Sequence, residues 1–154
     1  MEETSEKITD RFIIQNAEYA LGSASREWQA WIWKQYVLFR FYGIWEPGNY
    51  SHNLSDFYDI FSERKKTWPA VYFIIDANDL DIQNEEFRRY LKENWMHLLE
   101  REDLSICMVA AKEMKRLIWI SIMQLLGKQD RMPIFQDLSE AFAWIHGKRV
   151  KNGA

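Results

Sequence analysis

The stretch that decides the fold is Ala70-Val71-Tyr72-Phe73-Ile74-Ile75-Asp76, in which six apolar residues precede an aspartate. A continuous apolar run of this length, rich in β-branched and aromatic side chains, is typical of a parallel strand covered by helices on both faces. A second such run spans residues 104–110, and a shorter one spans residues 132–136. The sequence therefore predicts a sheet whose central strands are parallel.

Helical patterns separate these runs. Residues 54–61 place apolar side chains at the i, i+3, i+4 and i+7 positions of one helix face. A second apolar stripe extends over residues 87–98, with Asn84 as its predicted N-cap, and a third helix is predicted from about residue 112 to Gly127. Alternation of helices with buried strands indicates right-handed crossovers that return each strand beside the previous one.

The last helix has a signal at each end. Asp137 and Glu140 have the spacing of a capping box, with the aspartate as the cap. Gly147 has the residue type that most often ends a helix at the C′ position. The last helix is therefore predicted to end at Gly147.

The front third of the chain is predicted to be rich in β-structure. Short strands are expected at Phe12-Ile13-Ile14 and at residues 19–21, and longer ones at residues 27–33 and 36–44. The short connections between them favour antiparallel hairpins. Trp45-Glu46-Pro47-Gly48-Asn49 is expected to end the last of these strands, because proline fixes φ and glycine frees it.

These elements predict one α/β domain with a mixed sheet: antiparallel N-terminal strands, parallel central strands and about four helices. The domain is expected to span residues 11–149, between a polar N-terminal arm at residues 1–10 and a C-terminal tail at residues 150–154. A chain of 154 residues is long enough to bury its own core.

Composition narrows the functional classes. The net charge is −3 and the basic residues are scattered among acidic ones, so no basic stripe predicts a nucleic-acid partner. No apolar run approaches the ~18 residues that a membrane span needs. The single cysteine, Cys107, fits a reducing compartment, and the acidic start does not resemble a secretory signal. We therefore expect a cytoplasmic protein.

Two stretches resemble one bacterial family. Ala70-Val71-Tyr72-Phe73-Ile74-Ile75-Asp76, followed by Glu86-Phe87-Arg88-Arg89, is similar to the central strand and helix of STAS-like domains, the fold of anti-anti-sigma factors. The tail Phe135-Gln136-Asp137-Leu138-Ser139-Glu140-Ala141-Phe142-Ala143-Trp144-Ile145 resembles that family's last strand and helix. The resemblance covers roughly residues 30–147.

The resemblance implies a regulatory or protein-interaction role rather than catalysis. In anti-anti-sigma domains a Ser or Thr after the central strand is phosphorylated, and the added charge breaks partner binding. This chain has neither Ser nor Thr from Pro69 to Asp103, so that switch is absent from the expected place. The sequence also lacks a P-loop, a dinucleotide fingerprint and a nucleophile elbow, so neither an enzyme nor a cofactor is expected.

One candidate site follows the central strand. Open α/β sheets often bind ligands at the carboxyl ends of their strands, and carboxylate and amide oxygens suit Mg²⁺. The same residue types are also typical of a solvated turn, which is the simpler interpretation. The residues of this predicted loop site are Asp76, Asn78, Asp79 and Asp81.

The helix predicted at residues 112–126 is apolar on two faces. One stripe suits packing on the sheet and consists of Met114, Ile118, Ser121, Ile122 and Leu125. The other lies on or near the opposite side and consists of Trp119, Ile120, Met123 and Leu126. A helix apolar all round is normally buried on both sides, so the second stripe is predicted to meet a partner, with a homodimer the leading expectation. Cover by the N-terminal hairpin or arm is the alternative.

A different class of function rests on the tryptophans of the front third. Aromatic rings on both faces of a hairpin could line a pocket for a small hydrophobic or lipid-like ligand. An ordinary hydrophobic core explains the same rings. The residues concerned are Trp28, Trp31, Trp33 and Trp45.

Overall fold

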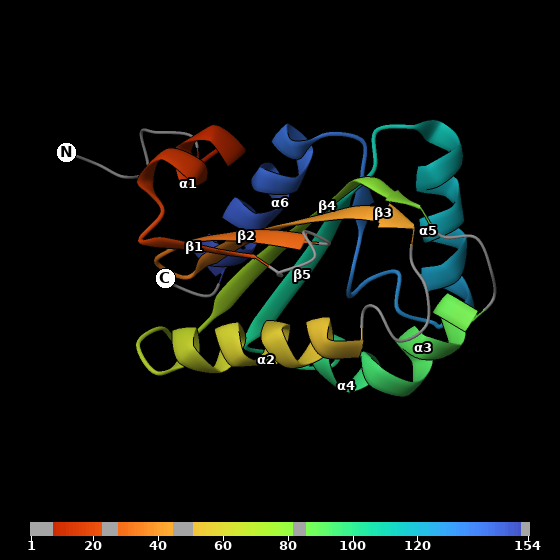
Figure 1. The fold of residues 1–154 in the computed structure, drawn as a ribbon, viewed down its shortest axis with the longest axis horizontal. Coiled ribbons are helices and arrows are strands. Elements are labelled where there is room, and N and C mark those ends of the chain that lie inside the picture. Colours follow the sequence, from red (N-terminus) through yellow and green to blue (C-terminus); the bar gives the residue numbers. More distant parts are fainter. Residues whose placement is uncertain (1–7, 23–27, 45–50, 82–85, 152–154) are drawn as a thin grey trace.

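The computed structural model describes residues 8–22, 28–44, 51–81 and 86–151 as one α/β unit (Figure 1). The strands are β1 (Tyr19–Gly22), β2 (Trp28–Trp33), β3 (Tyr36–Ile44), β4 (Val71–Asp81), β5 (Leu104–Val109) and β6 (Ile134–Phe135). The helices are α1 (Asp10–Asn16), α2 (Ser51–Lys65), α3 (Glu86–Asn94), α4 (Met96–Leu99), α5 (Glu113–Leu125) and α6 (Leu138–Lys151).

All six strands join in one sheet in chain order, β1-β2-β3-β4-β5-β6. The pairs β1–β2 and β2–β3 are antiparallel, whereas β3–β4, β4–β5 and β5–β6 are parallel. This arrangement confirms the predicted mixed sheet with an antiparallel front and parallel centre. The described residues contain six helices rather than about four, because α1 was not predicted and the stripe over residues 87–98 divides into α3 and α4.

The order of the strands determines which face each helix covers. Three crossovers, through α2, through α3 with α4, and through α5, all step in the same direction across the sheet, so right-handedness places them on one face. The helices α1 and α6 lie outside these crossovers and cover the other face (Figure 1).

The first five residues of β4, Val71–Ile75, are all apolar because both faces of the strand are covered. Val71, Phe73 and Ile75 point into the core under α2, α4 and α5, where the Phe57 ring lies 4.2 Å from the Phe73 ring. Tyr72 and Ile74 point into a second core under α1 and α6. Because side chains alternate along a strand, a strand buried on both faces needs apolar residues at every position.

The predicted strand Phe12-Ile13-Ile14 is wrong, because these residues belong to α1. Thr9 caps this helix, its Oγ1 accepting from the Phe12 backbone N–H at 3.1 Å, and Ile13 is fully buried against the sheet. The cap and this contact outweigh the preference of paired isoleucines for strands. The polar arm therefore cannot reach residue 10, since Asp10 is already helical.

α6 begins as predicted and ends later. The Asp137 Oδ1 accepts from the Glu140 backbone N–H at 2.9 Å, while the Glu140 Oε1 accepts from Gln136 N–H, one residue earlier than in a standard capping box. The predicted end at Gly147 is wrong, because the helix continues to Lys151 and takes in part of the expected tail. An exposed helical glycine costs only about 1 kcal/mol, so it need not end a helix.

Two predicted features fall outside the described residues. They are the strand break at residues 45–49 and the helix cap at Asn84.

Candidate functional site

The residues predicted to form a loop site lie instead in β4. Pairing of β3 with β4 continues as far as Ile44 opposite Asp81, so this part of the chain is a strand rather than a loop. The sequence predicts too short a strand because Asp and Asn are depleted from strands in general. Here the neighbouring strand β3 continues alongside these residues and pairs with them as far as Asp81.

β4 carries a bulge within this segment. Arg40 pairs with Asp76, but Tyr42 pairs with Asp79, so β4 holds one extra residue between the two pairs. A bulge of this kind resets the alternation of side chains. Accordingly, Ala77 and Leu80 both join the core under α2 and α5, although an uninterrupted strand would point them to opposite faces.

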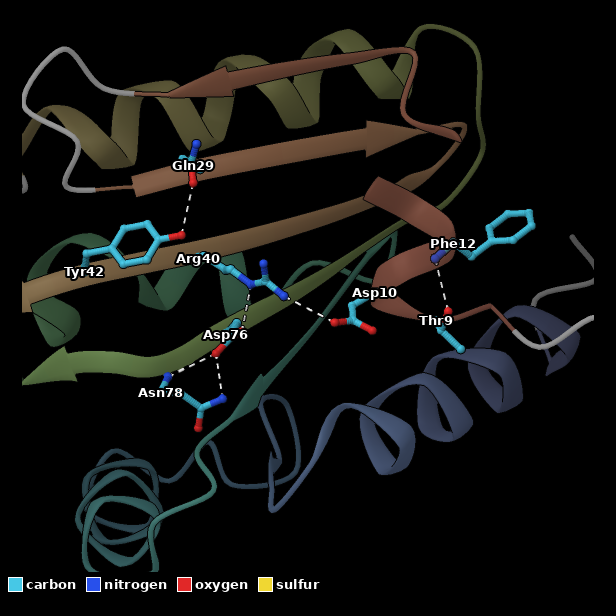
Figure 2. A network of polar contacts seen from close by, with 8 residues as sticks. All are labelled: Thr9, Asp10, Phe12, Gln29, Arg40, Tyr42, Asp76 and Asn78. Atoms are coloured by element: carbon cyan, nitrogen blue, oxygen red, sulfur yellow. Dashed lines mark hydrogen bonds and ion pairs between the residues drawn. The ribbon is translucent and has the colours of Figure 1, made fainter. Parts of the chain in front are cut away.

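Asp76 is the centre of a polar network on the face covered by α1 and α6 (Figure 2). Its side chain is 10% exposed and forms an ion pair with Arg40, whose Nε donates to Oδ2 at 3.0 Å. Its Oδ1 accepts from the backbone N–H of Asn78 at 3.1 Å and from the Asn78 Nδ2 at 2.8 Å. Both carboxylate oxygens are therefore engaged, as a buried charge requires.

Arg40 connects this network to the N-terminal helix. Its Nη2 lies 3.2 Å from the Asp10 Oδ2 in the first turn of α1, so one guanidinium bridges two carboxylates (Figure 2). The guanidinium also lies 5.2 Å from the centre of the Trp31 ring on β2, within the range of a cation–π contact. Arg40 thus joins β2, β3, β4 and α1.

Asn78 extends the network to α5. Its Oδ1 accepts from the Ala111 backbone N–H at 2.7 Å, and its carbonyl oxygen accepts from the Lys115 Nζ at 2.6 Å. Lys115 also pairs with Asp81 at 3.3 Å. The bulge residue therefore fixes the start of α5 against the end of β4.

This arrangement is that of a structural clamp. Asp76 and Asp81 each pair with a cation of the chain itself, and Asp79 is exposed. Within residues 8–22, 28–44, 51–81 and 86–151, no three His, Cys, Asp or Glu side chains gather as a metal site would need. Arg40 was not among the predicted site residues, although it is the one charged residue in the strand Tyr36–Ile44 and a buried charge needs a partner.

The two apolar faces of α5 are exchanged relative to the prediction. Trp119 and Met123, expected at a partner interface, are 2% and 1% exposed and belong to the main core. Leu126 packs against the same core, and Ile120 is half-buried. Periodicity shows that both faces are apolar but does not say which one meets the sheet.

The face that was expected to pack on the sheet is largely exposed. Met114 is 73% exposed and Leu125 is 67% exposed, and Ser121 between them is also exposed. Of the predicted stripe, only Ile122 is buried, at the border of the core. The large apolar side chains exposed on α5 are Met114, Leu117, Ile118 and Leu125; elsewhere in the described residues they are Leu21 and Val150.

A hollow lies beside this face, where α5 meets the end of β4. It has a volume of about 260 Å³, and its apolar lining comes from Leu80, Met114, Ile118 and Trp119. Three charged residues line it as well, Asp81, Lys112 and Lys115, and the Lys115 ammonium group is bound to Asp81 and to the Asn78 carbonyl. The hollow therefore extends the exposed stripe with both apolar and charged side chains.

The tryptophans of the front third pack against other side chains. Trp28 is 3% exposed, with its ring centre 5.3 Å from that of Phe39, and Trp33 stacks on Tyr36 at 5.6 Å. Trp31 faces the Arg40 guanidinium. Trp28 and Trp33 therefore pack on aromatic neighbours, and Trp31 packs on a guanidinium group. Trp45 lies outside the described residues.

Comparison with models of known protein families, with curated proteins and with solved structures finds no significant match to this chain. The described part of the chain contains no helix long and apolar enough to cross a membrane. Its α/β architecture and its exposed surfaces therefore carry the functional argument.

Proposed function

We propose that this chain is a non-enzymatic protein-interaction module of the STAS-like type, which binds its partner through the exposed apolar face of α5. The observation that carries the proposal is the clustering of four exposed large apolar residues on one helix, Met114, Leu117, Ile118 and Leu125. Exposed apolar side chains scattered singly are ordinary, whereas a contiguous stripe marks a binding surface.

The polar network of β4 supports a role without catalysis. A general acid or base needs a group that can reach a substrate, with a proton it can give or take. Asp76 is buried, and both of its oxygens already accept hydrogen bonds from Arg40 and Asn78. Neither oxygen is therefore available to a substrate, and Asn78 connects this network to the start of α5.

The STAS-like assignment rests on the resemblance of two stretches of sequence and fits the mixed sheet with parallel central strands. A fold does not by itself specify a function, so the interaction surface is proposed from α5 and not from the family. Since the expected Ser or Thr acceptor is missing, control of this surface would come from a signal other than phosphorylation there.

Site-specific photo-crosslinking tests this proposal. A photoreactive amino acid replaces Leu117 in cells that produce the protein, and the same residue replaces the exposed Ser139 on α6 as the matched control. We expect a discrete protein adduct at Leu117 and none at Ser139. The captured protein, once purified, should bind the wild-type chain and not Leu125→Glu. Absence of any adduct above the control would contradict the proposal.

A further inference from the structure

The partner itself can be inferred from the spacing and charge of the α5 face. We propose that a second copy of this chain covers it, the two α5 helices packing antiparallel about a twofold axis that passes between Ile118 and Ser121 of the exposed face. This inference rests on the proposed function and names its partner.

The spacing of the stripe is that of a helix–helix seam. Met114, Ile118, Ser121 and Leu125 are separated by four, three and four residues, the repeat with which two helices pack side by side. In an antiparallel pair centred on this stripe, Met114 lies opposite Leu125 of the second copy, and Ile118 lies opposite its Ser121. The stripe is thus complementary to itself: large residues meet at its ends, and the small serine makes room for isoleucine at its centre.

The charges beside the stripe favour an apolar partner over an anionic one. Lys115 is bound to Asp81 and to the Asn78 carbonyl, and its side chain is only 15% exposed. The Arg116 Nη1 donates to the carbonyl oxygens of Ala110 and Ala111 at 3.2 and 2.9 Å. Lys115 and Arg116 therefore face their own chain, and exposed Lys112 at the N-cap is the remaining basic side chain beside the start of the stripe. An anionic membrane or an acidic peptide would require several basic groups to face outward.

The stripe is small for an interface between two folded chains. From Met114 to Leu125 the helix rises about 16 Å, and one helix face of that length buries well below the ~800 Å² per partner of a standard stable interface. We therefore expect a weak dimer, with a dissociation constant on the order of tens of micromolar. Such a complex would exchange with monomer at cellular concentrations.

Sedimentation equilibrium with a charge swap tests both the partner and the orientation. We compare wild type with Met114→Glu, with Leu125→Lys and with an equimolar mixture of the two variants. Controls carry Ser139→Glu or His146→Lys on the exposed surface of α6. Thermal unfolding checks that every variant remains folded.

In the antiparallel pair, the new carboxylate of one variant lies beside the new ammonium group of the other. We expect wild type and both controls to dimerise at about 100 µM, each α5 variant to dimerise at least tenfold more weakly, and the mixture to recover a dimer. A parallel pair would leave the new charges far apart, so a mixture that stays monomeric overturns the antiparallel arrangement. If wild type remains monomeric up to about 1 mM, the partner is not a second copy of this chain. In that case the proposed function still stands if the photoreactive residue at position 117 crosslinks to a different protein. If it crosslinks to no protein, the dimer and the proposed function both fail.

Discussion

Arg40 and Asp76 lie opposite each other on the parallel strands β3 and β4, and the Arg40 Nε donates to the Asp76 Oδ2 at 3.0 Å. The pair stands immediately before the bulge that turns Leu80 into the core. Asn78, which donates to the same carboxylate, also accepts from the Ala111 backbone N–H just before α5 and from the Lys115 Nζ in its first turn. The position of the exposed apolar face therefore depends on an ion pair on the opposite side of the sheet.

Removing the cation from this pair should destabilise the fold. In Arg40→Met the buried Asp76 carboxylate loses its counter-ion, and we expect the free energy of unfolding to fall by about 2 kcal/mol, less than for a fully buried pair because Arg40 is 26% exposed. Urea denaturation measures the loss. The control is Lys66→Met, which breaks the solvent-exposed pair with Glu63 and should cost below about 0.5 kcal/mol. Equal losses in the two variants would show that Arg40 is an ordinary surface residue.

The two glycines near helix ends should respond to alanine in opposite directions. Gly147 lies inside α6, and a Cβ there would meet no atom within 4 Å, so Gly147→Ala should stabilise the protein by about 0.5–1 kcal/mol. Gly127 follows α5 with a φ of +70°, where Gly127→Ala should destabilise by about 1 kcal/mol. Thermal unfolding of the two variants compares them directly. A helix that ended at Gly147 would reverse the first result.

Cys107 should be unreactive in the folded protein. Burial raises the pKa of its thiol far above the ordinary value, so the reactive thiolate is not formed near neutral pH. We expect a colourimetric disulfide reagent at about pH 8 to release no colour from the native protein and one equivalent per chain in concentrated guanidinium chloride. Rapid reaction of the native protein would mean that β5 is accessible from solvent.

Asp103 should contribute stability above its pKa only. The Arg101 guanidinium binds it through two hydrogen bonds of 2.8 Å, and this contact, aided by Lys65, lowers the pKa of Asp103 from its ordinary value of 3.8. A carboxylate whose pKa falls on folding stabilises the protein above the unfolded-state pKa, and this contribution is lost as the pH falls through the folded-state pKa. Asp103→Asn should therefore cost up to about 1 kcal/mol at neutral pH and nothing in strong acid. A cost that stays constant down to about pH 2 would assign the loss to packing.

The sheet was predictable because its signals are local. The apolar run from Ala70 to Ile75 indicates a strand covered on both faces, and hydrogen bonding confirms β4 with parallel neighbours. The helix at Phe12-Ile13-Ile14 was not predictable from propensity, because its stability comes from the Thr9 cap and from the burial of Ile13 against the sheet. Tertiary contacts override the intrinsic secondary-structure preference of a segment where the two favour different structures.

The site was predictable only in part, for a related reason. The sequence identifies α5 as apolar on two faces but cannot say which face packs inward, because that depends on how Lys115 and the bulge at Asn78 fix the start of the helix. One clue was present: Trp119 is the largest side chain on the helix and gains most from burial. The bulge itself follows from a register shift between β3 and β4, which no local pattern records.

The interaction surface exists only if Trp119 and Met123 face the core, and the unfolding of two matched double variants tests this orientation of α5. Trp119→Glu with Met123→Glu places two charges in the core, whereas Ile118→Glu with Leu125→Glu places them on the exposed face. Urea denaturation followed by circular dichroism should show no cooperative transition for the first pair. The second pair should stay within about 1 kcal/mol of the wild-type free energy of unfolding. The opposite result, a folded first pair and an unfolded second pair, would contradict the orientation of α5 and with it the interaction surface.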